Sequence, residues 1–322
     1  MKYLFLMVPI IIGCSERTPG DFSTVKVHTG MHFDALVDTL VNKKIVESPA
    51  LLRLYARVTG DDRRIQAGEY SLQQYSHWKD ALRALTEGSV VLFDLTIPEG
   101  LMLQEIAEKI SNHVTLSAED IYSQISEPSL HETWSLPGPG LEGYLFPDTY
   151  RFPKGVVLEV VLETMIEEYK SIWTPDRIAR LDDLNMTEGE LMTLASIIQA
   201  EARIEEEMPR ISSVYHNRLR LGYLLQADPT VIYALGSRRS RLLFAAIDSV
   251  ADNPYNTYTQ RGLPPGPIAA AGRLAIDAAL YPSEDSYLYF VAHPDGQHIF
   301  SNTLQEHNRA VQEVRSISSK RP

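Results

Sequence analysis

The feature that most constrains the fold is a pattern that occurs twice in the first third of the chain. Setting Gly30 over Gly100 aligns VKVHTGMHFDALVDTL with FDLTIPEGLMLQEIAEKI. In both copies an alternating stretch precedes the glycine, and apolar residues at three- and four-residue spacing follow it, which predicts strand, turn and amphipathic helix. The pattern therefore indicates a duplicated small α/β unit. The aligned apolar pairs are Phe33 and Leu103, Leu36 and Ile106, and Leu40 and Ile110.

Three further segments complete the first copy. A helical pattern runs from Ala50 to Val58, a short strand from Gly68 to Leu72, and another helix from Trp78 to Leu85. The resulting βααβ order resembles the LysM-like domain, a small peptidoglycan-binding fold. The resemblance implies an N-terminal LysM-like α/β module at residues 25–92. The alternative is a plain α/β scaffold without a ligand.

Composition and charge limit the classes of protein to which the chain can belong. Its 322 residues are 44% hydrophobic and 22% charged, which is typical of a globular protein of about two domains. Forty-two acidic residues against 30 basic ones give a formal net charge of -12. No run of Lys or Arg is dense enough to follow a phosphate backbone, so nucleic acid is not expected as a partner.

The N-terminus reads MKYLFLMVPIIIGCSERTPG, with an apolar run from Tyr3 to Ile12. The run is shorter than the roughly 20 residues that span a bilayer, and its layout is that of a signal peptide. Its ending, IIGC, resembles a bacterial lipoprotein processing site. This implies a signal peptide at 1–13, lipidation of Cys14, and a linker over 14–24. The alternative is an uncleaved anchor with an ordinary thiol; Cys14 is the only cysteine, so no intramolecular disulfide can form.

The remaining chain alternates loop and helix patterns. Pro128 to Gly155 is rich in Pro and Gly and predicts an ordered loop, and a second such stretch reads NPYNTYTQRGLPPGPIAAAG. The other predicted elements are a helix from Val157 to Tyr169, a helix at Leu274 to Leu280, strands at Tyr287 to Ala292 and His298 to Ser301, and a terminal helix from about Leu304.

The segment LASIIQAEAR, residues 194–203, places Glu201 near the end of an otherwise apolar helical stretch. Thr187, with a glutamate three residues later, has the spacing of a capping box, so we expect the helix to begin near Glu188. A proline further on predicts that it ends or kinks near Glu207. At about 100° per residue, Glu201 falls on the border of one buried face. The residues of that face are Leu191, Leu194, Ala195, Ile198 and Ala202.

The position of Glu201 has two interpretations. A carboxyl group beside apolar groups loses hydration, which raises its pKa, and a general acid working near neutral pH needs such a pKa. The alternative is a glutamate whose stem packs while its head reaches water. Glu205, one helical turn later, is a rival candidate for the acid.

Five sequence blocks together resemble the endolytic murein transglycosylases of the YceG-like family. They are EGYLFPDTYRF, LASIIQAEA, SSVYHNRLRLGYLLQADPTVIYALG, NPYNTYTQRGLPPGPIAAAG and YLYFVAHPDGQHIFSNTLQEHN, and they extend the match over about Val25 to Val311. The resemblance implies an α+β chain in which LysM-like modules precede a mixed α/β YceG-like catalytic domain at 93–322. Within that domain, 93–127 would form the second strand–helix unit and 128–322 the catalytic core.

The same resemblance implies a lyase that cuts MurNAc–GlcNAc bonds within nascent glycan strands, leaves 1,6-anhydroMurNAc ends and so terminates glycan elongation. The family's catalytic glutamate falls on Glu201, while Gln199 and Ala202 depart from the family's usual Glu and Thr. One carboxyl group can suffice because the MurNAc C6 hydroxyl, rather than water, attacks C1. The alternatives are a muramidase that adds water, with Glu205 or Asp228 as its base, and a non-catalytic peptidoglycan-binding scaffold.

The blocks also supply candidate substrate-binding residues, although caps and turns use the same residue types. Asp228, for example, precedes a proline and could simply cap a helix. His293, His298 and His307 lack the spacing of a metal motif, and we expect neither a metal nor a cofactor. The substrate-binding candidates are Asn217, Gln226, Asp228, Thr230, Tyr255, Asn256 and Tyr258.

The resemblance and the N-terminus together imply a protein of the bacterial cell envelope, with its catalytic domain outside the cytoplasm. The family uses an inner-membrane helix as anchor, whereas the sequence of this chain suggests a lipid. The expected partners are peptidoglycan glycan strands, the membrane that holds the anchor, and peptidoglycan synthases.

Overall fold

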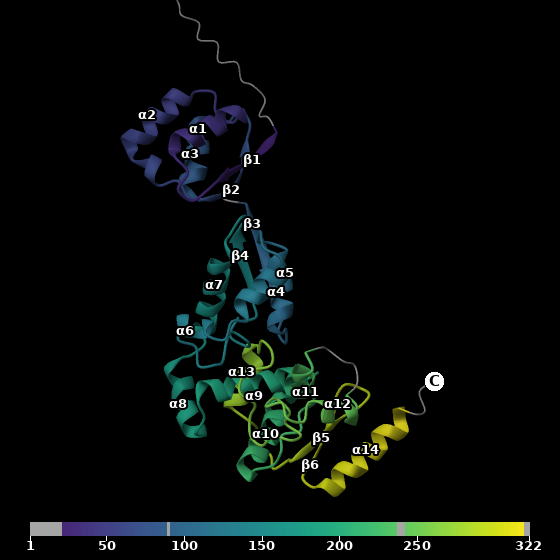
Figure 1. Ribbon diagram of the computed structural model, residues 1–322. Helices are drawn as coiled ribbons and strands as arrows, with labels where there is room; N and C mark the ends of the chain where they lie inside the picture. Colours follow the sequence, from purple (N-terminus) through teal and green to yellow (C-terminus); the bar gives the residue numbers. More distant parts are fainter. Residues whose placement is uncertain (1–20, 89–90, 237–241, 319–322) are drawn as a thin grey trace, which may run out of the picture. The chain divides into compact units, whose positions relative to one another are not determined.

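The computed structural model describes residues 21–88, 91–236 and 242–318 (Figure 1). The chain divides into two compact units: one runs up to Phe93 and includes Pro153–Gly155, and the other comprises Asp94–Phe152 and the chain from Val156 onward. The predicted signal peptide, Cys14 and the linker up to residue 20 lie outside the described residues. Within the described part of the chain, no helix has the length and apolar character needed to cross a membrane.

The first unit has the predicted order of elements. Strands β1 and β2 pair antiparallel, with Phe22 opposite Gln73 and Val27 opposite Gly68. Three elements had predicted limits, and all three lie within two residues of them, because their hydrophobic periods are clear. The elements are β1 (Phe22–Val27), α1 (Phe33–Asn42), α2 (Pro49–Thr59), a short 3-10 turn (Asp61–Arg63), β2 (Gly68–Gln73) and α3 (Trp78–Glu87).

The core of this unit follows from the sequence alternation. Val25 and Val27 point inward from β1, and Leu36, Leu40 and Leu85 cover them from the helices. Full burial of each such side chain contributes about 1.5–3 kcal/mol.

The second copy of the repeated pattern also folds as strand, turn and helix, as predicted. Strand β3 (Leu92–Thr96) precedes α4 (Leu103–Ser111). The two aligned glycines share a left-handed backbone, with φ of 79° at Gly30 and 76° at Gly100, a conformation that costs glycine least. This conformation explains why the repeat has glycine at both turns.

Part of the segment predicted as a loop is regular. It contains α6 (Leu130–Thr133) and β4 (Thr149–Pro153), which pairs with β3. Alternating burial in TYRFP, with Tyr150 and Phe152 inside, stabilises a strand that the neighbouring Pro and Gly residues obscure in the sequence. Helix α5 (Ala118–Ile125) packs against α4.

The rest of the second unit is mainly helical. Helix α9 is central and packs against α8, α10, α11 and α13, while α14 packs against a hairpin of the antiparallel strands β5 and β6 (Figure 1). The elements are α7 (Leu158–Ser171), α8 (Pro175–Leu184), α9 (Glu188–Glu201), a 3-10 turn (Glu205–Glu207), α10 (Met208–Leu221), α11 (Asp228–Ala234), α12 (Phe244–Ser249), α13 (Arg273–Leu280), β5 (Tyr289–Ala292), β6 (His298–Ser301) and α14 (Leu304–Ser318). The protein is thus a mixed α and β chain, as expected.

Helix α9 corrects two sequence predictions. It begins with the predicted capping box, in which Thr187 Oγ1 accepts a hydrogen bond from the Glu190 backbone N–H at 3.2 Å. It is not amphipathic, however, because every residue from 191 to 198 is buried. It also ends at Glu201 rather than near Glu207, since Ala202 is extended with ψ of 128°. The carboxyl group that was predicted on the border of a helix face therefore lies at the end of a buried helix.

Candidate active site

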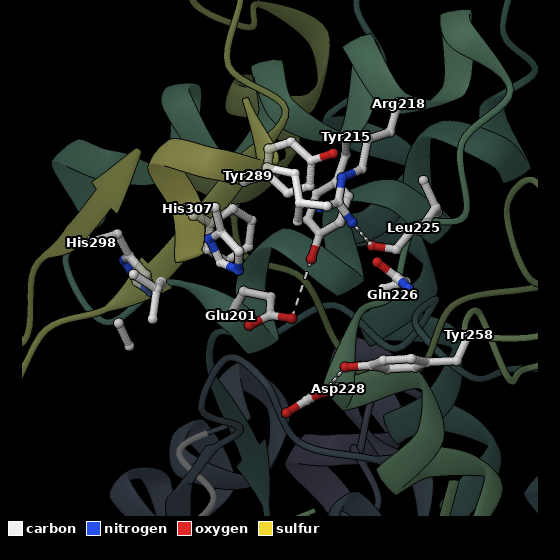
Figure 2. Close-up of a pocket in the computed structure, with 14 residues that line it drawn as sticks. Glu201, Tyr215, Arg218, Leu225, Gln226, Asp228, Tyr258, Tyr289, His298 and His307 are labelled. Atoms are coloured by element: carbon white, nitrogen blue, oxygen red, sulfur yellow. Dashed lines mark hydrogen bonds between the residues drawn. The ribbon is translucent and has the colours of Figure 1, made fainter. Parts of the chain in front are cut away.

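A cavity of about 340 Å³ lies where the C-terminal end of α9 meets α10, the start of α11 and the β5–β6 hairpin (Figure 2). Glu201 lies between Tyr215 and Asp228 in this view, with the histidines of the hairpin and α14 to one side. The residues that line the cavity are Glu201, Tyr215, Arg218, Leu225, Gln226, Asp228, Tyr258, Tyr289, Phe290, Val291, Ala292, His298, Leu304 and His307.

Glu201 has the electrostatic character of a general acid. Burial of its carboxyl group raises the pKa to about 7, and the negative charge of Asp228 acts in the same direction. A hydrogen bond from Tyr215 and the positive charge of Arg218 oppose the shift. A carboxyl group with a pKa near neutrality can both give and take a proton at physiological pH.

Tyr215 fixes one oxygen of this carboxyl group. Its hydroxyl donates to Glu201 Oε1 at 3.2 Å, and its ring is 1% exposed and lies edge-on to Phe290 at 5.9 Å. Burial also holds the pKa of Tyr215 well above its ordinary value, so the hydroxyl keeps its proton and remains a donor. Tyr215 is not among the site residues predicted from the sequence, because a tyrosine on a helix has no motif of its own.

Arg218 lies one turn after Tyr215 on the same face of α10. Its Nε donates to the Leu288 carbonyl at 2.7 Å, and its Nη1 donates to the Leu225 carbonyl at 2.7 Å. The guanidinium group also lies 5.2 Å from the centre of the Tyr289 ring. These contacts tie the hairpin and the segment before α11 to α10, and they place a buried positive charge near Glu201.

Three of the predicted substrate-binding residues line the cavity. Asp228 is the first residue of α11, and its Oδ1 accepts a hydrogen bond from the Tyr258 hydroxyl at 2.5 Å. Gln226 is exposed and has a φ of 49°. Non-glycine residues in this left-handed region cost free energy and concentrate at functional sites.

The other four predicted substrate-binding residues do not line the cavity, because internal contacts occupy their side chains. Asn217 Nδ2 donates to the carbonyl groups of Asp285 and Tyr287 at 2.9 and 3.1 Å. Thr230 and Asn256 are completely buried. Each donates to a backbone carbonyl, Thr230 to Ala227 and Asn256 to Ile247, and Tyr255 packs on Tyr233 with 4.8 Å between ring centres.

Two of these residues, Asn256 and Thr230, hold segments that form the walls of the site. Asn256 Oδ1 accepts from the Tyr258 backbone N–H at 3.0 Å, so it orients the turn that carries Tyr258. The Thr230 hydroxyl lies 2.9 Å from that of Thr257, which joins α11 to the same turn.

Glu205 lies outside the cavity, whereas two of the three histidines line it. Glu205 is exposed in the 3-10 turn and does not line the cavity. His298 and His307, which lack the spacing of a metal motif, form part of the cavity wall. His298 Nδ1 lies 2.7 Å from Glu207, and His307 stacks on Tyr289 at 5.3 Å. Among the described residues, no group of three His, Cys, Asp or Glu side chains is placed to hold a metal ion.

The chain is similar in sequence to proteins of one family over most of its length. The model of the YceG-like family matches residues 25–313. A protein of Bacillus subtilis (strain 168) named endolytic murein transglycosylase is 32% identical over 312 residues, which cover 92% of this chain and 85% of that protein. A protein of the same name from Streptococcus pneumoniae (strain D39) is 29% identical over 322 residues, with 91% of this chain and 58% of that protein covered.

A solved structure shares the fold as well. The 2.6 Å crystal structure of a YceG-like protein from Listeria monocytogenes superimposes with a TM-score of 0.61 at 32% identity, covering 90% of this chain and 98% of that one. Since the family model spans both copies of the repeated unit and the whole cavity lining, the chain belongs to the YceG-like family.

Proposed function

We propose that this chain is an endolytic lytic transglycosylase that cuts MurNAc–GlcNAc bonds within nascent peptidoglycan strands, leaves 1,6-anhydroMurNAc ends and so terminates glycan elongation. The observation that carries the proposal is Glu201, a carboxyl group with a pKa raised to about 7 in a cavity at the end of a buried helix. The names of the relatives from B. subtilis and S. pneumoniae support the same reaction.

Glu201 serves as acid and then as base. Protonated Glu201 donates its proton to the glycosidic oxygen, the bond from that oxygen to C1 of MurNAc breaks, and positive charge develops at C1. The carboxylate that remains accepts the proton of the MurNAc C6 hydroxyl while that oxygen bonds to C1. Tyr215 engages Oε1, so Oε2 is the oxygen that meets the glycosidic bond. No water enters this reaction. Glu201 donates one proton to the glycosidic oxygen and accepts one from the C6 hydroxyl, so it ends in its starting protonation state.

Asp228 stabilises the transition state. A fixed negative charge on the cavity wall favours the positive charge that develops at C1, and the hydrogen bond from Tyr258 holds the carboxylate in place. Gln226 and Tyr258 join it in contacting the sugar. Four residues do not contact the sugar and instead support the segments that carry the contacting side chains: Asn217, Thr230, Tyr255 and Asn256.

A water-using muramidase is the second candidate, because Asp228 is a second carboxylate at the cavity and hydrolysis needs one. Mass spectrometry of digested, uncrosslinked glycan separates the two reactions. We expect anhydro ends from the wild type and no new ends from Glu201→Gln, whereas reducing MurNAc ends would identify the muramidase.

The third candidate is a non-catalytic scaffold. Sacculus binding measured in the same samples tests it. Loss of cleavage with retained binding in Glu201→Gln rejects the scaffold, and a wild type that binds but never cuts supports it.

We further propose that the first unit is a LysM-like peptidoglycan-binding module over residues 25–92. The two helices between antiparallel strands and a hydrophobic core of its own support this. The catalytic domain then covers 93–322, with 93–127 as the second strand–helix unit and 128–322 as the core. Limited proteolysis should release a stable fragment ending near residue 92, and cleavage inside either part would contradict these limits.

The N-terminal residues determine where in the cell envelope the protein is anchored. We propose that 1–13 is a signal peptide, that Cys14 is lipidated with 14–24 as linker, and that the catalytic domain acts outside the cytoplasm beside peptidoglycan synthases. Metabolic labelling with a lipid probe should mark the wild type and disappear in Cys14→Ala. Labelling that persists in this variant would refute the lipid anchor, and crosslinking in intact cells tests the synthase contact.

A further inference from the structure

A second cavity, of about 490 Å³, lies beside the C-terminal end of α9, and the proposed mechanism does not use it. Its walls come from the loop before α4, the last turn of α9, the first turns of α11 and the segment before α13. Residues that define it are Glu99, Met102, Gln199, Pro229, Ile232 and Ile268.

The second cavity adjoins the catalytic one at two points of the backbone. Ala200 lines the second cavity and Glu201 the first, while Pro229 lines the second and Asp228 the first. Consecutive Cα atoms are about 3.8 Å apart. The end of α9 and the start of α11 therefore form a shared partition, with the acid on one side and the second cavity on the other.

The walls of the second cavity are held by hydrogen bonds. The Gly100 N–H donates to the Ala270 carbonyl at 2.7 Å, and the Ala270 N–H donates to the Leu101 carbonyl at 2.9 Å. On the opposite wall, Gln199 Oε1 accepts from the Gly272 N–H at 3.0 Å. Binding sites are usually formed in advance in this way.

The first turn of α4 is fixed in the same manner. The Met102 N–H donates to the Glu105 carboxylate at 2.8 Å, and the Leu103 N–H donates to that of Glu142 at 3.1 Å. The loop that ends at this helix is thus anchored on both sides.

The lining chemistry fits a neutral acetamido sugar. Pro229, Ile232 and Ile268 offer apolar surface for the C–H face of a sugar ring and for an acetamido methyl group. Glu99 is exposed at the rim, where its carboxylate oxygens accept hydrogen bonds from hydroxyl and amide groups. No Lys, Arg or His lines the cavity among the residues that the structure describes, so nothing there pairs with the carboxylates of a stem peptide.

We propose that this second cavity binds an N-acetylated sugar of the glycan strand, next to the sugar pair that is cleaved at Glu201. The inference rests on the proposed function and names an additional binding site for its substrate. Contacts distant from the reacting bond supply binding energy that the catalytic site can use, and a strand that continues past the cut needs such a site.

The main test fills the cavity. Ile232→Trp places a large side chain in it, and Ile178→Trp, at an exposed position of α8 that lines neither cavity, is the matched control. On long peptide-free glycan strands we expect kcat/KM to fall at least about tenfold for Ile232→Trp, the scale set by one misfitted apolar contact. The lengths of the fragments should also shift, while the control matches the wild type.

A second variant keeps the inference testable if Ile232→Trp fails to fold. Glu99→Ala changes an exposed side chain and should lower kcat/KM about threefold, as expected for one lost hydrogen bond. Calorimetric titration of Glu201→Gln with peptide-free glycan oligosaccharides, with and without Ile232→Trp, measures binding without cleavage. Weaker binding by the double variant supports the second cavity even if the wild type cleaves nothing, which separates this inference from the proposed reaction.

Two results would overturn the inference. The first is equal kcat/KM and equal fragment lengths for Ile232→Trp, Glu99→Ala and the control on long strands. The second is an effect that is seen with peptide-bearing strands and vanishes with peptide-free ones, because this would identify a stem peptide as the occupant.

Discussion

Removal of the Tyr215 hydroxyl tests how the protein sets the protonation of Glu201. A donor to a carboxylate stabilises its charged form and lowers its pKa, and the hydroxyl donates to Glu201 Oε1 at 3.2 Å. Tyr215→Phe removes this bond and leaves the buried ring in place. The pKa of Glu201, about 7 with the bond, should therefore rise.

The size of the shift follows from the strength of the bond. A hydrogen bond to a charged group contributes about 1.5–3 kcal/mol, and the 3.2 Å length places this one at the weak end. At about 1.4 kcal/mol per pKa unit, we expect an increase of about one unit. Because the raised pKa keeps Glu201 protonated to higher pH, the alkaline limb of the activity profile should move upward by the same amount.

The assay is the rate of anhydro-end formation between pH 5 and 9, with thermal unfolding measured in parallel. Loss of orientation should also lower kcat by up to about a hundredfold, the lower end of the loss when one positioned catalytic donor is removed. A profile that does not move, or that moves to lower pH, would refute the assignment of Tyr215 as the donor that controls Glu201. A lower kcat with an unchanged profile would indicate a purely structural tyrosine.

Three further outcomes are expected. The raised pKa of Glu201 means that the folded protein holds this proton more tightly than the unfolded chain, so stability falls as pH rises from about 4.5 to about 7. At pH 8, Glu201→Gln should therefore have a free energy of unfolding about 2 kcal/mol higher than the wild type, a figure reduced from the full pKa shift because Glu201 is partly exposed. An equally or less stable variant would contradict this. Asp228→Asn removes a charge that raises the pKa of Glu201, so the alkaline limb of the activity profile should move to lower pH, opposite to Tyr215→Phe. The kcat should also fall about a hundredfold if Asp228 stabilises developing charge. An unchanged pH profile would argue against the electrostatic effect of Asp228 on Glu201. Gly100→Ala forces a side chain into a left-handed turn with φ of 76°, and urea unfolding should show a loss of about 1 kcal/mol. Unchanged stability would contradict strain at this turn.

The elements that the sequence predicts well are those with local causes. The strand, glycine turn and helix repeat was predictable because Gly30 and Gly100 mark the same left-handed turn and the flanking apolar residues keep a clear period. The capping box at Thr187 fixed the start of α9 for the same reason. Burial of the Glu201 carboxyl group was one of two interpretations that the sequence left open, and the raised pKa follows from that burial.

The errors concern tertiary contacts. A helix surrounded by four others has no polar face, so periodicity misplaced the environment of Glu201. Asn217 and Asn256 belong to motif blocks, yet their amides bond to backbone carbonyl groups, and no residue pattern distinguishes such an amide from one that contacts sugar. Tyr215 was missed because its role depends on the approach of α10 to the end of α9.

The most direct test of the central claim is digestion of uncrosslinked glycan strands in water labelled with oxygen-18. If Glu201 activates the C6 hydroxyl of MurNAc, the new ends should be 1,6-anhydroMurNAc and should contain none of the labelled oxygen. Reducing MurNAc ends that contain the label would contradict the account, because they would show that water rather than the C6 hydroxyl attacks C1.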